Sequence, residues 1–256
     1  MIKIEIDDFI NAKEILLENE IKTNIEKLNQ LLHLNKSKKN KQHFHKKTTL
    51  NVSNKSLIKE CLNKITNETY EMHIENLINL INNYDDKKTI AEDIFNICKN
   101  NIFYSELYSR LYYELIINKQ LLIFKEILDN NKKELFSMYN NIEYIDAEIN
   151  YDKFCKNNKL NELIKSQTTF YAYLYNKTLV DEEYIMDLLF NLFNKIKTET
   201  SDKNIFEYIE NIKVILSITY QKIKNHVRFI EVKDLLNKIK SKSEGYTHIK
   251  NKTLFK

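Results

Sequence analysis

The chain has 256 residues, of which 43% are hydrophobic and 30% are charged, and its formal net charge is +4 at pH 7. A chain of this length can bury a core without disulfides or metals, which excludes a stapled miniprotein, and its apolar content excludes a wholly disordered chain. It contains one glycine and no proline, against average shares of about 7% and about 5%. The turn chemistry of hairpins and sandwiches is therefore largely missing, and we expect helices joined by short connectors.

The three cysteines, Cys61, Cys98 and Cys155, form no C-x-x-C pair, so the sequence indicates neither a zinc site nor a redox motif and favours a reducing compartment. The first residues lack a basic segment followed by an apolar run, and no apolar stretch approaches the roughly 18 residues of a membrane span. We therefore expect a soluble cytoplasmic protein that does not enter a membrane. The abundance of Asn, Lys and Ile is typical of AT-rich coding, which suggests a protist or a large DNA virus.

The first part of the chain divides into two predicted segments. Residues 1–34 carry an uneven helical stripe of aliphatic side chains, which predicts an N-terminal helical segment. Residues 35–55 are polar and unperiodic, which predicts a flexible linker. Between Asn35 and Lys47 this linker holds six lysines and no acid, and subtracting six charges from +4 leaves −2 for the rest of the chain. The basic character of the protein is therefore local.

From residue 56 onward a helical period is clear, with apolar residues three and four apart along Ile74–Ile81, Leu107–Leu115 and Ile205–Leu216. Acidic residues at Asp85–Asp86 and Asp181–Glu183 predict helix starts. Asparagine tolerates the left-handed conformation that often closes a helix. We therefore interpret five asparagine pairs as helix ends, and they begin at Asn82, Asn100, Asn130, Asn140 and Asn157.

The spacing of these predicted ends indicates a repeat. Intervals of about 20 residues give helical hairpins of about 40 residues, which is the period of HEAT-like repeats. We predict an all-α fold, a HEAT-like α-solenoid of about four to five antiparallel helix pairs at residues 56–241, followed by a C-terminal tail at residues 242–256.

Six segments, in order, support a family resemblance. The first, Cys61-Leu-Asn-Lys-Ile-Thr-Asn-Glu-Thr-Tyr70, resembles the motif L-N-K-L-T-P-x-x-F, and Phe124-Lys-Glu-Ile-Leu-Asp-Asn130 with Glu134-Leu-Phe136 resembles F-R-x-L-L-L-N-x-x-Q-x-E-F. The other four are Ile94–Leu111, with Asn101-Ile-Phe103 in place of E-P-x-F, Phe170–Tyr175, Ile205–Tyr220 and His226–Ile230. Over about Ser56 to Lys240 the chain thus resembles the middle domain of eukaryotic translation initiation factor 4 gamma. The family's prolines are missing, and only Gln221–Asn225 remain where it inserts a further helix, which predicts a trimmed fifth repeat.

The resemblance implies a scaffold without catalytic activity that binds the DEAD-box helicase initiation factor 4A, holds its two lobes half-closed and acts with it on mRNA. It further implies a monomer within a hetero-complex, in which residues 1–34 are our candidate for recruiting a cap-binding protein. Similar domains serve nonsense-mediated decay and deadenylation, so the fold does not fix the pathway. The alternatives are an RNA-binding regulatory protein and another helical-repeat adaptor in mRNA metabolism.

The residues expected to bind the helicase lie in the matched segments. Phe170, Tyr173 and Tyr175 cannot all face one stripe of a helix, so we expect at least one exposed ring; the alternative for Phe170 and Tyr175 is a place in the core. Asn130, Lys132 and Lys133 are expected at a helix end or inter-repeat loop, with a solvated cap as the alternative. Arg228 and Lys233 are expected on the last helix, with a solvated charged face as the alternative. Phe136, which ends the matched segment that begins at Phe124, completes the candidates.

The lysine-rich linker is the candidate RNA-binding segment, because lysines seek phosphates and one ring can stack on a base. A plain flexible linker is the alternative. The candidate residues are Lys36, Lys38, Lys39, Lys41, Phe44, Lys46 and Lys47.

No motif of an enzyme is present: one glycine cannot build a phosphate loop, and neither H-E-x-x-H nor a nucleophile elbow occurs. His43-Phe-His45 lacks further ligands at metal-site spacing, so we expect no metal and no cofactor. Tyr184–Phe190 fits the Y-x-x-x-x-L-Φ motif that recruits a cap-binding protein. We interpret it instead as a buried helix of a repeat.

Overall fold

The computed structural model describes residues 54–243, with side chains from 56 to 239. The chain divides into two units, residues 1–51 and 52–256, and the described helices belong to the second. The predicted N-terminal segment, nearly all of the predicted linker and the predicted tail beyond residue 243 lie outside the described residues.

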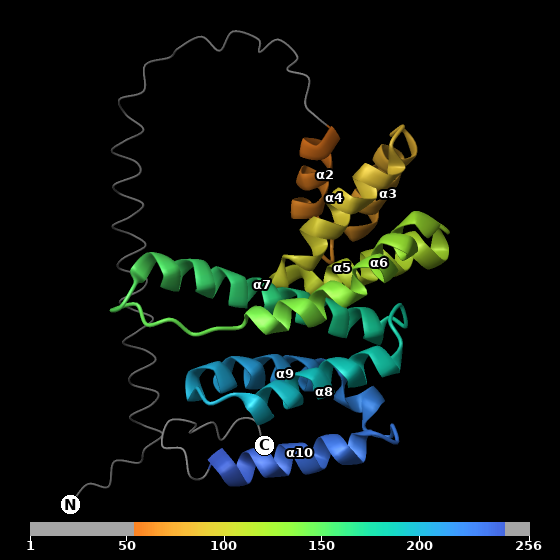
Figure 1. Ribbon diagram of the computed structural model, residues 1–256. Helices are drawn as coiled ribbons and strands as arrows, with labels where there is room; N and C mark the ends of the chain where they lie inside the picture. Colours follow the sequence, from red (N-terminus) through yellow and green to blue (C-terminus); the bar gives the residue numbers. More distant parts are fainter. Residues whose placement is uncertain (1–53, 244–256) are drawn as a thin grey trace, which may run out of the picture. The chain divides into compact units, whose positions relative to one another are not determined.

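The described part of the chain is built of α-helices and contains no β-strand, which confirms the all-α class (Figure 1). The helices are α2 (Asn54–Lys64), α3 (Tyr70–Asn82), α4 (Lys87–Lys99), α5 (Ser105–Tyr113), α6 (Leu122–Met138), α7 (Tyr151–Asn176), α8 (Glu182–Thr198), α9 (Asp202–Ile223) and α10 (Phe229–Ser243). A 3₁₀ turn, η1 (Ile102–Tyr104), precedes α5, and a π-helical turn, η2 (Glu114–Asn118), follows it. A second 3₁₀ turn, η3 (Tyr139–Asn141), follows α6.

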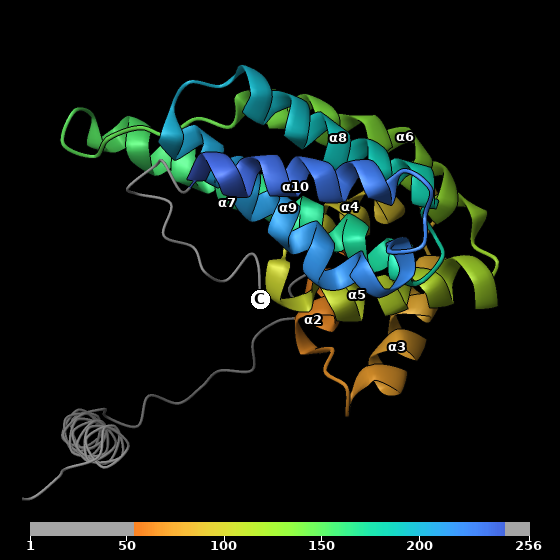
Figure 2. The same cartoon turned by 90° about the horizontal axis from the view of Figure 1, so that it is seen from below.

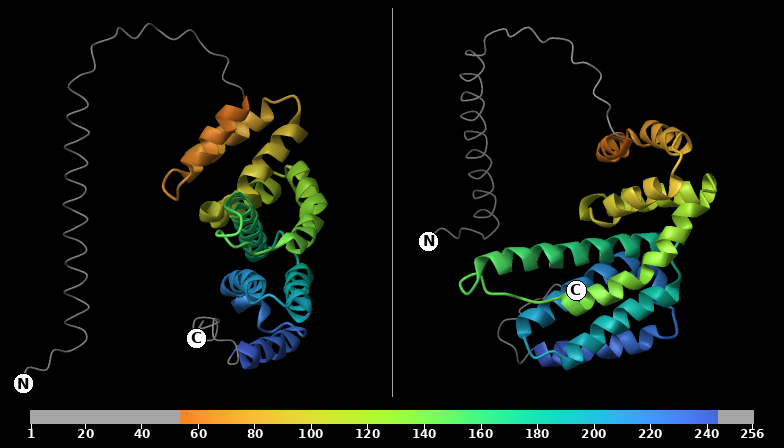
Figure 3. Two further views of the ribbon diagram at one scale, coloured as in Figure 1. Left: turned by 60° about the vertical axis from the view of Figure 1, so that its left-hand side comes forward. Right: turned by 45° about the horizontal axis from the view of Figure 1, so that its top comes forward.

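The helices pack mainly against near neighbours in sequence. Helix α2 lies against α3, α4 against α6, α5 against α7, and α8 against both α9 and α10 (Figures 2 and 3). Helix α7, the longest at 26 residues, contacts α4, α5, α6, α8 and α9. It therefore joins the N-terminal and C-terminal helices of the described unit. None of the helices within residues 54–243 combines the length and the apolar character of a membrane span.

The predicted helix starts are confirmed where a side chain caps the helix. Asp86 accepts a hydrogen bond from the backbone N–H of Thr89, and Asp181 accepts one from that of Tyr184. Asn150 and Ser201 do the same for α7 and α9. Each side chain satisfies one of the N–H groups that the first helical turn leaves unpaired.

Two of the five predicted asparagine stops are wrong. The Asn130 pair lies inside α6 and the Asn157 pair inside α7. Their amides bond to carbonyl groups instead of closing a helix: Asn131 Nδ2 donates to the Ile127 carbonyl 2.8 Å away, and Asn157 Nδ2 donates to that of Glu143. Apolar residues at helical spacing continue beyond both pairs, so burial prolongs each helix.

The other asparagine pairs lie at helix ends, but not in the expected conformation. Asn83 and Asn100 close α3 and α4 with φ of −87° and −102°. Among the described residues other than glycine, only Gln120 and Thr178 have positive φ. The Thr178 N–H donates to the Tyr175 carbonyl and the Leu179 N–H donates to the Leu174 carbonyl, as in a Schellman motif. The left-handed stop of α7 therefore falls on a threonine that no asparagine rule could indicate.

The apolar period predicted most of the core. Ile74, Leu77 and Ile81 are buried, as are Ile205, Tyr208 and Ile209. An aromatic cluster from four helices lies between them, with Phe95 on α4, Tyr112 on α5, Phe124 on α6 and Phe170 on α7. Tyr112 meets Phe124 and Phe170 edge to face, with ring centroids 5.7 Å and 5.5 Å apart. These contacts hold α4, α5, α6 and α7 together, since such pairs stabilise beyond their buried area.

Replacing Phe170 by Ala removes a fully buried ring from this cluster and should lower the free energy of unfolding by about 3–5 kcal/mol. The matched control is Phe103→Ala, where the ring is 92% exposed, and its effect should stay within about 0.5 kcal/mol. Urea unfolding followed by circular dichroism measures both. Equal losses in the two variants would contradict the core described here.

Candidate functional site

The residues predicted to bind a helicase are divided among three helices and one turn. Four lie on α6, three on α7, one in the turn before α10 and one on α10. The predicted RNA-binding residues, Lys36 to Lys47 with Phe44, lie outside the described residues.

The α6 candidates do not sit at a helix end or loop, as the sequence had predicted, because α6 continues to Met138. Lys132 is committed to neighbours: its Nζ lies 2.8 Å from Asp129 and 3.8 Å from Asp181, and only 18% of its side chain is exposed. Asn130 and Lys133 are exposed on the same helix. Of Asn130, Lys132 and Lys133, only Asn130 and Lys133 are therefore fully accessible to a partner.

The aromatic candidates are mostly part of the core. Phe170 is fully buried, and Tyr175 is buried with its hydroxyl 3.3 Å from Glu182 Oε1. Burial and this carboxylate raise the pKa of Tyr175 to about 12. Phe136 is half-buried with its ring edge to face on Tyr184, at 5.5 Å. Of the three α7 aromatics, only Tyr173 is partly exposed, and the other two are buried.

The buried-helix interpretation of Tyr184–Phe190 is confirmed for the motif's key positions. Tyr184 and Leu189 are buried on α8, and the Tyr184 hydroxyl donates to the Lys132 carbonyl at 2.9 Å. A cap-binding protein could not reach these side chains without unfolding α8.

Arg228 belongs to an ion-pair cluster rather than to a free basic surface. It precedes α10, and its Nη1 lies 2.6 Å from Glu183 and 2.9 Å from Asp187, while its guanidinium covers the Phe190 ring at 4.5 Å. His226 Nε2 lies 3.1 Å from the same Glu183 carboxylate. The hydrogen bond from Arg228 is the main reason that the pKa of Glu183 is lowered from 4.5. Arg228 therefore ties the α9–α10 turn to α8, a role that neither the predicted helicase contact nor a solvated face included.

Lys233 is exposed on α10, where its ammonium group lies 5.5 Å from the Phe229 ring. Its position agrees with either a partner contact or a solvated face, the two interpretations that the sequence left open.

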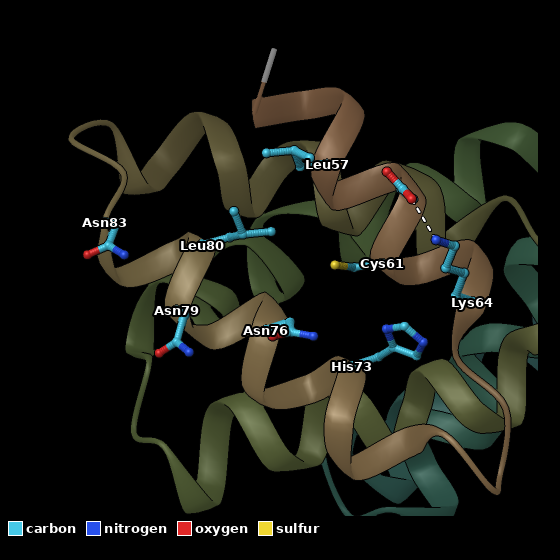
Figure 4. A pocket seen from close by; sticks show the side chains of 9 residues that line it. Leu57, Cys61, Lys64, His73, Asn76, Asn79, Leu80 and Asn83 are labelled. Atoms are coloured by element: carbon cyan, nitrogen blue, oxygen red, sulfur yellow. Dashed lines mark hydrogen bonds and ion pairs between the residues drawn. The ribbon is translucent and has the colours of Figure 1, made fainter. Parts of the chain in front are cut away.

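A hollow of about 440 Å³ lies between α2 and α3 (Figure 4). Leu57 and Cys61 of α2 and Leu80 of α3 form its apolar part, and Glu60 and Lys64 pair with each other at 2.6 Å on its rim. Burial raises the pKa of Cys61, so the thiol stays protonated and is a poor nucleophile.

Polar groups that could hold a metal do not converge in residues 54–243: no cluster of three or more His, Cys, Asp or Glu side chains has a suitable arrangement there. His73 is the one histidine that lines the α2–α3 hollow. It is 8% exposed, and its Nδ1 lacks a hydrogen-bond partner.

Sequence reasoning missed the most exposed large apolar side chain of the described residues. Phe103, on η1, is 92% exposed, and it occupies the apolar position of a matched motif. Its neighbours Ile102 and Tyr104 are half-buried. The available signal was three consecutive apolar residues, Ile-Phe-Tyr, in a short connector, since one turn cannot direct all three side chains into a core.

A scan of the chain against protein-family models found no matching family, and a search among curated proteins found no match either. The assignment of a function therefore rests on the residues and their arrangement.

Replacing Arg228 by Gln should raise the pKa of Glu183 toward its ordinary value of 4.5. Because the pKa of Glu183 is lowered in the folded protein, the stabilisation is present above that ordinary value and is lost as the pH falls through the lowered one. The stability difference between wild type and Arg228→Gln should therefore be largest near neutral pH and shrink as the pH falls through the lowered pKa of Glu183.

NMR titration of the side-chain carboxyl carbons follows the pKa, and urea midpoints at several pH values follow stability. Lys233→Gln, on the adjacent helix, is the control and should leave the titration of Glu183 unchanged. A Glu183 titration that is the same in wild type and Arg228→Gln would refute the ion pair.

Proposed function

We propose that this protein is a non-catalytic helical-repeat scaffold that binds and positions a DEAD-box RNA helicase of the initiation factor 4A type on mRNA during translation initiation. The observation that carries the proposal is the order of six matched segments along α2 to α10. Several of their apolar positions are core positions, as at Leu62, Tyr70, Phe95, Leu111 and Phe124, each buried, whereas Phe103, Val227 and Ile230 are exposed.

The architecture proposed for this scaffold is a HEAT-like α-solenoid. The packing of α2 on α3, of α8 on α9 and of α10 on α8 supports it, because repeats of this kind contact mainly their neighbours. In such an array the loops and half-exposed helix faces present contacts while the core stays rigid. A rigid scaffold can hold two helicase lobes at a fixed separation, which is a positioning role and needs no reacting group.

The proposed partners are the helicase, mRNA through the helicase, and a cap-binding protein recruited by residues 1–34. The proposed setting is the cytoplasm, or the host cytoplasm if the gene is viral, with the protein as a single copy in a hetero-complex.

The purified protein should bind a purified initiation factor 4A type helicase with a dissociation constant of about 1 μM or tighter. It should also raise the helicase's RNA-dependent ATPase rate, because holding the lobes near their closed arrangement shortens the cycle. Isothermal titration calorimetry and an ATPase assay measure the two effects. No binding, together with an unchanged ATPase rate, would refute the proposal.

A second candidate function is RNA binding through the lysine-rich segment, which is favoured by its six lysines without an acid and the phenylalanine among them. If all six lysines contact phosphates of single-stranded RNA, the logarithm of the affinity should fall with the logarithm of salt concentration with a slope of about −4.

Fluorescence anisotropy with an oligouridine measures this slope in the full chain and in a variant with the six lysines changed to Gln. Undiminished affinity in that variant would exclude the lysine-rich segment as the RNA-binding site.

A further inference from the structure

His226 holds the turn between α9 and α10 through both nitrogens of its ring. Its Nδ1 accepts a hydrogen bond from the backbone N–H of Arg228, 3.2 Å away, and its Nε2 lies 3.1 Å from Glu183 Oε1 on α8. The backbone of His226 is also anchored, because its N–H donates to the Ile223 carbonyl and its carbonyl accepts from the Phe229 N–H, each at 2.9 Å. Only 12% of the side chain is exposed. The ring therefore connects the start of α10 to α8 from a fixed position.

This pair of bonds requires one protonation state of the ring. A backbone N–H can only donate, so Nδ1 must present a lone pair to Arg228 and cannot carry a proton. An ionised carboxylate can only accept, so the bond to Glu183 requires a proton on Nε2. The geometry therefore corresponds to the neutral imidazole with its proton on Nε2. In the charged imidazolium both nitrogens are donors, so protonation removes the acceptor of the Arg228 N–H and keeps the bond to Glu183.

The charges around the ring affect how readily it takes up a proton, but they do not replace the lost acceptor. The Glu183 carboxylate attracts the added charge, and the Arg228 guanidinium, which is also bound to Asp187 at 2.9 Å, repels it. Lys222 and Lys224 donate to other oxygen atoms. The titratable and charged side chains on the adjoining parts of the neighbouring elements are Tyr175 and Lys177 at the end of α7, Glu182, Glu183 and Asp187 on α8, Lys222 on α9, Lys224 and Arg228 in the turn, and Glu231 on α10.

We propose that His226 is a pH-sensitive cap of α10, which holds the backbone of the α9–α10 turn closed when the ring is neutral and releases it when the ring is protonated. Histidine is the side chain whose charge changes between about pH 5 and pH 8. Val227, between the two bonded residues, is 79% exposed and adds no buried side chain that would keep the turn closed. The bond to Glu183 persists, so the ring stays on α8 while the Arg228 N–H opens to solvent.

Two substitutions separate the two bonds of the ring. In His226→Asn the side-chain oxygen can take the place of Nδ1, and the amide does not titrate. In His226→Gln the amide reaches the position of Nε2 and leaves the Arg228 N–H without its acceptor. The first variant therefore imitates the closed turn at every pH, and the second imitates the protonated one.

The readout is hydrogen exchange of the Arg228 amide, measured by NMR in the full chain and corrected for the intrinsic effect of pH on exchange. In wild type its protection should fall at least about threefold between about pH 8 and about pH 5, as expected for the loss of one hydrogen bond. Protection should stay high at both pH values in His226→Asn and low at both in His226→Gln. The control is the Lys153 amide, whose acceptor is the uncharged Asn150 side chain at 2.9 Å; its protection should not change.

The wild-type measurement tests the inference without any variant. Equal protection of the Arg228 amide at the two pH values would overturn it, as would ring nitrogen chemical shifts that place the proton on Nδ1 near pH 8. The same fall in His226→Asn as in wild type would assign the effect to another titrating group and would also overturn it.

Discussion

Buried hydrogen bonds from side chains of α7 to neighbouring elements constrain how the helices pack around it. The Thr168 hydroxyl lies 2.9 Å from both the Tyr139 hydroxyl and Asn211 Oδ1, and the Ser166 hydroxyl donates to the Lys99 carbonyl at 3.1 Å. These side chains are buried, and a buried polar group without a partner costs about 1–3 kcal/mol. Sliding α7 by one residue would break these bonds together, so a single register against α4 and α9 is favoured.

This register also fixes the connector between α4 and α5, which carries Phe103. Lys99, only 6% exposed, lies at the end of α4, and its ammonium group pairs with Glu134 at 2.7 Å. The Asn100 side chain, next in the chain, accepts from Gln167 Nε2 at 3.2 Å. The connector that carries Phe103 therefore starts from a position held by α6 and α7. The buried hydrogen bonds and ion pair at the end of α4 therefore orient the turn η1, which exposes Phe103 to solvent.

The buried faces of the helices could be predicted from the sequence, but the contacts between side chains far apart in the sequence could not. The period of three and four identified the buried faces of α3 and α9, and the caps at Asp86 and Asp181 followed from residue type and position alone. The asparagine rule failed at Asn130 and Asn157 because an asparagine amide also bonds within or beside a helix. The Arg228 cluster depends on Glu183, 45 residues away in sequence, and spacing cannot reveal such a contact.

The candidate site was the least predictable feature for the same reason. The matched segments consist mainly of core positions, so they indicated how the chain folds more than what it touches. Three of the proposed binding side chains, Lys132, Phe170 and Arg228, contact other parts of the fold, while Phe103, which was not among the candidates, is exposed.

The central claim is the proposal that the described helices bind a DEAD-box helicase. Hydrogen–deuterium exchange of the full chain, measured with and without a saturating initiation factor 4A type helicase, tests it most directly. The account predicts slower amide exchange on at least one face of the helices within residues 54–243. Unchanged exchange throughout these residues would contradict it.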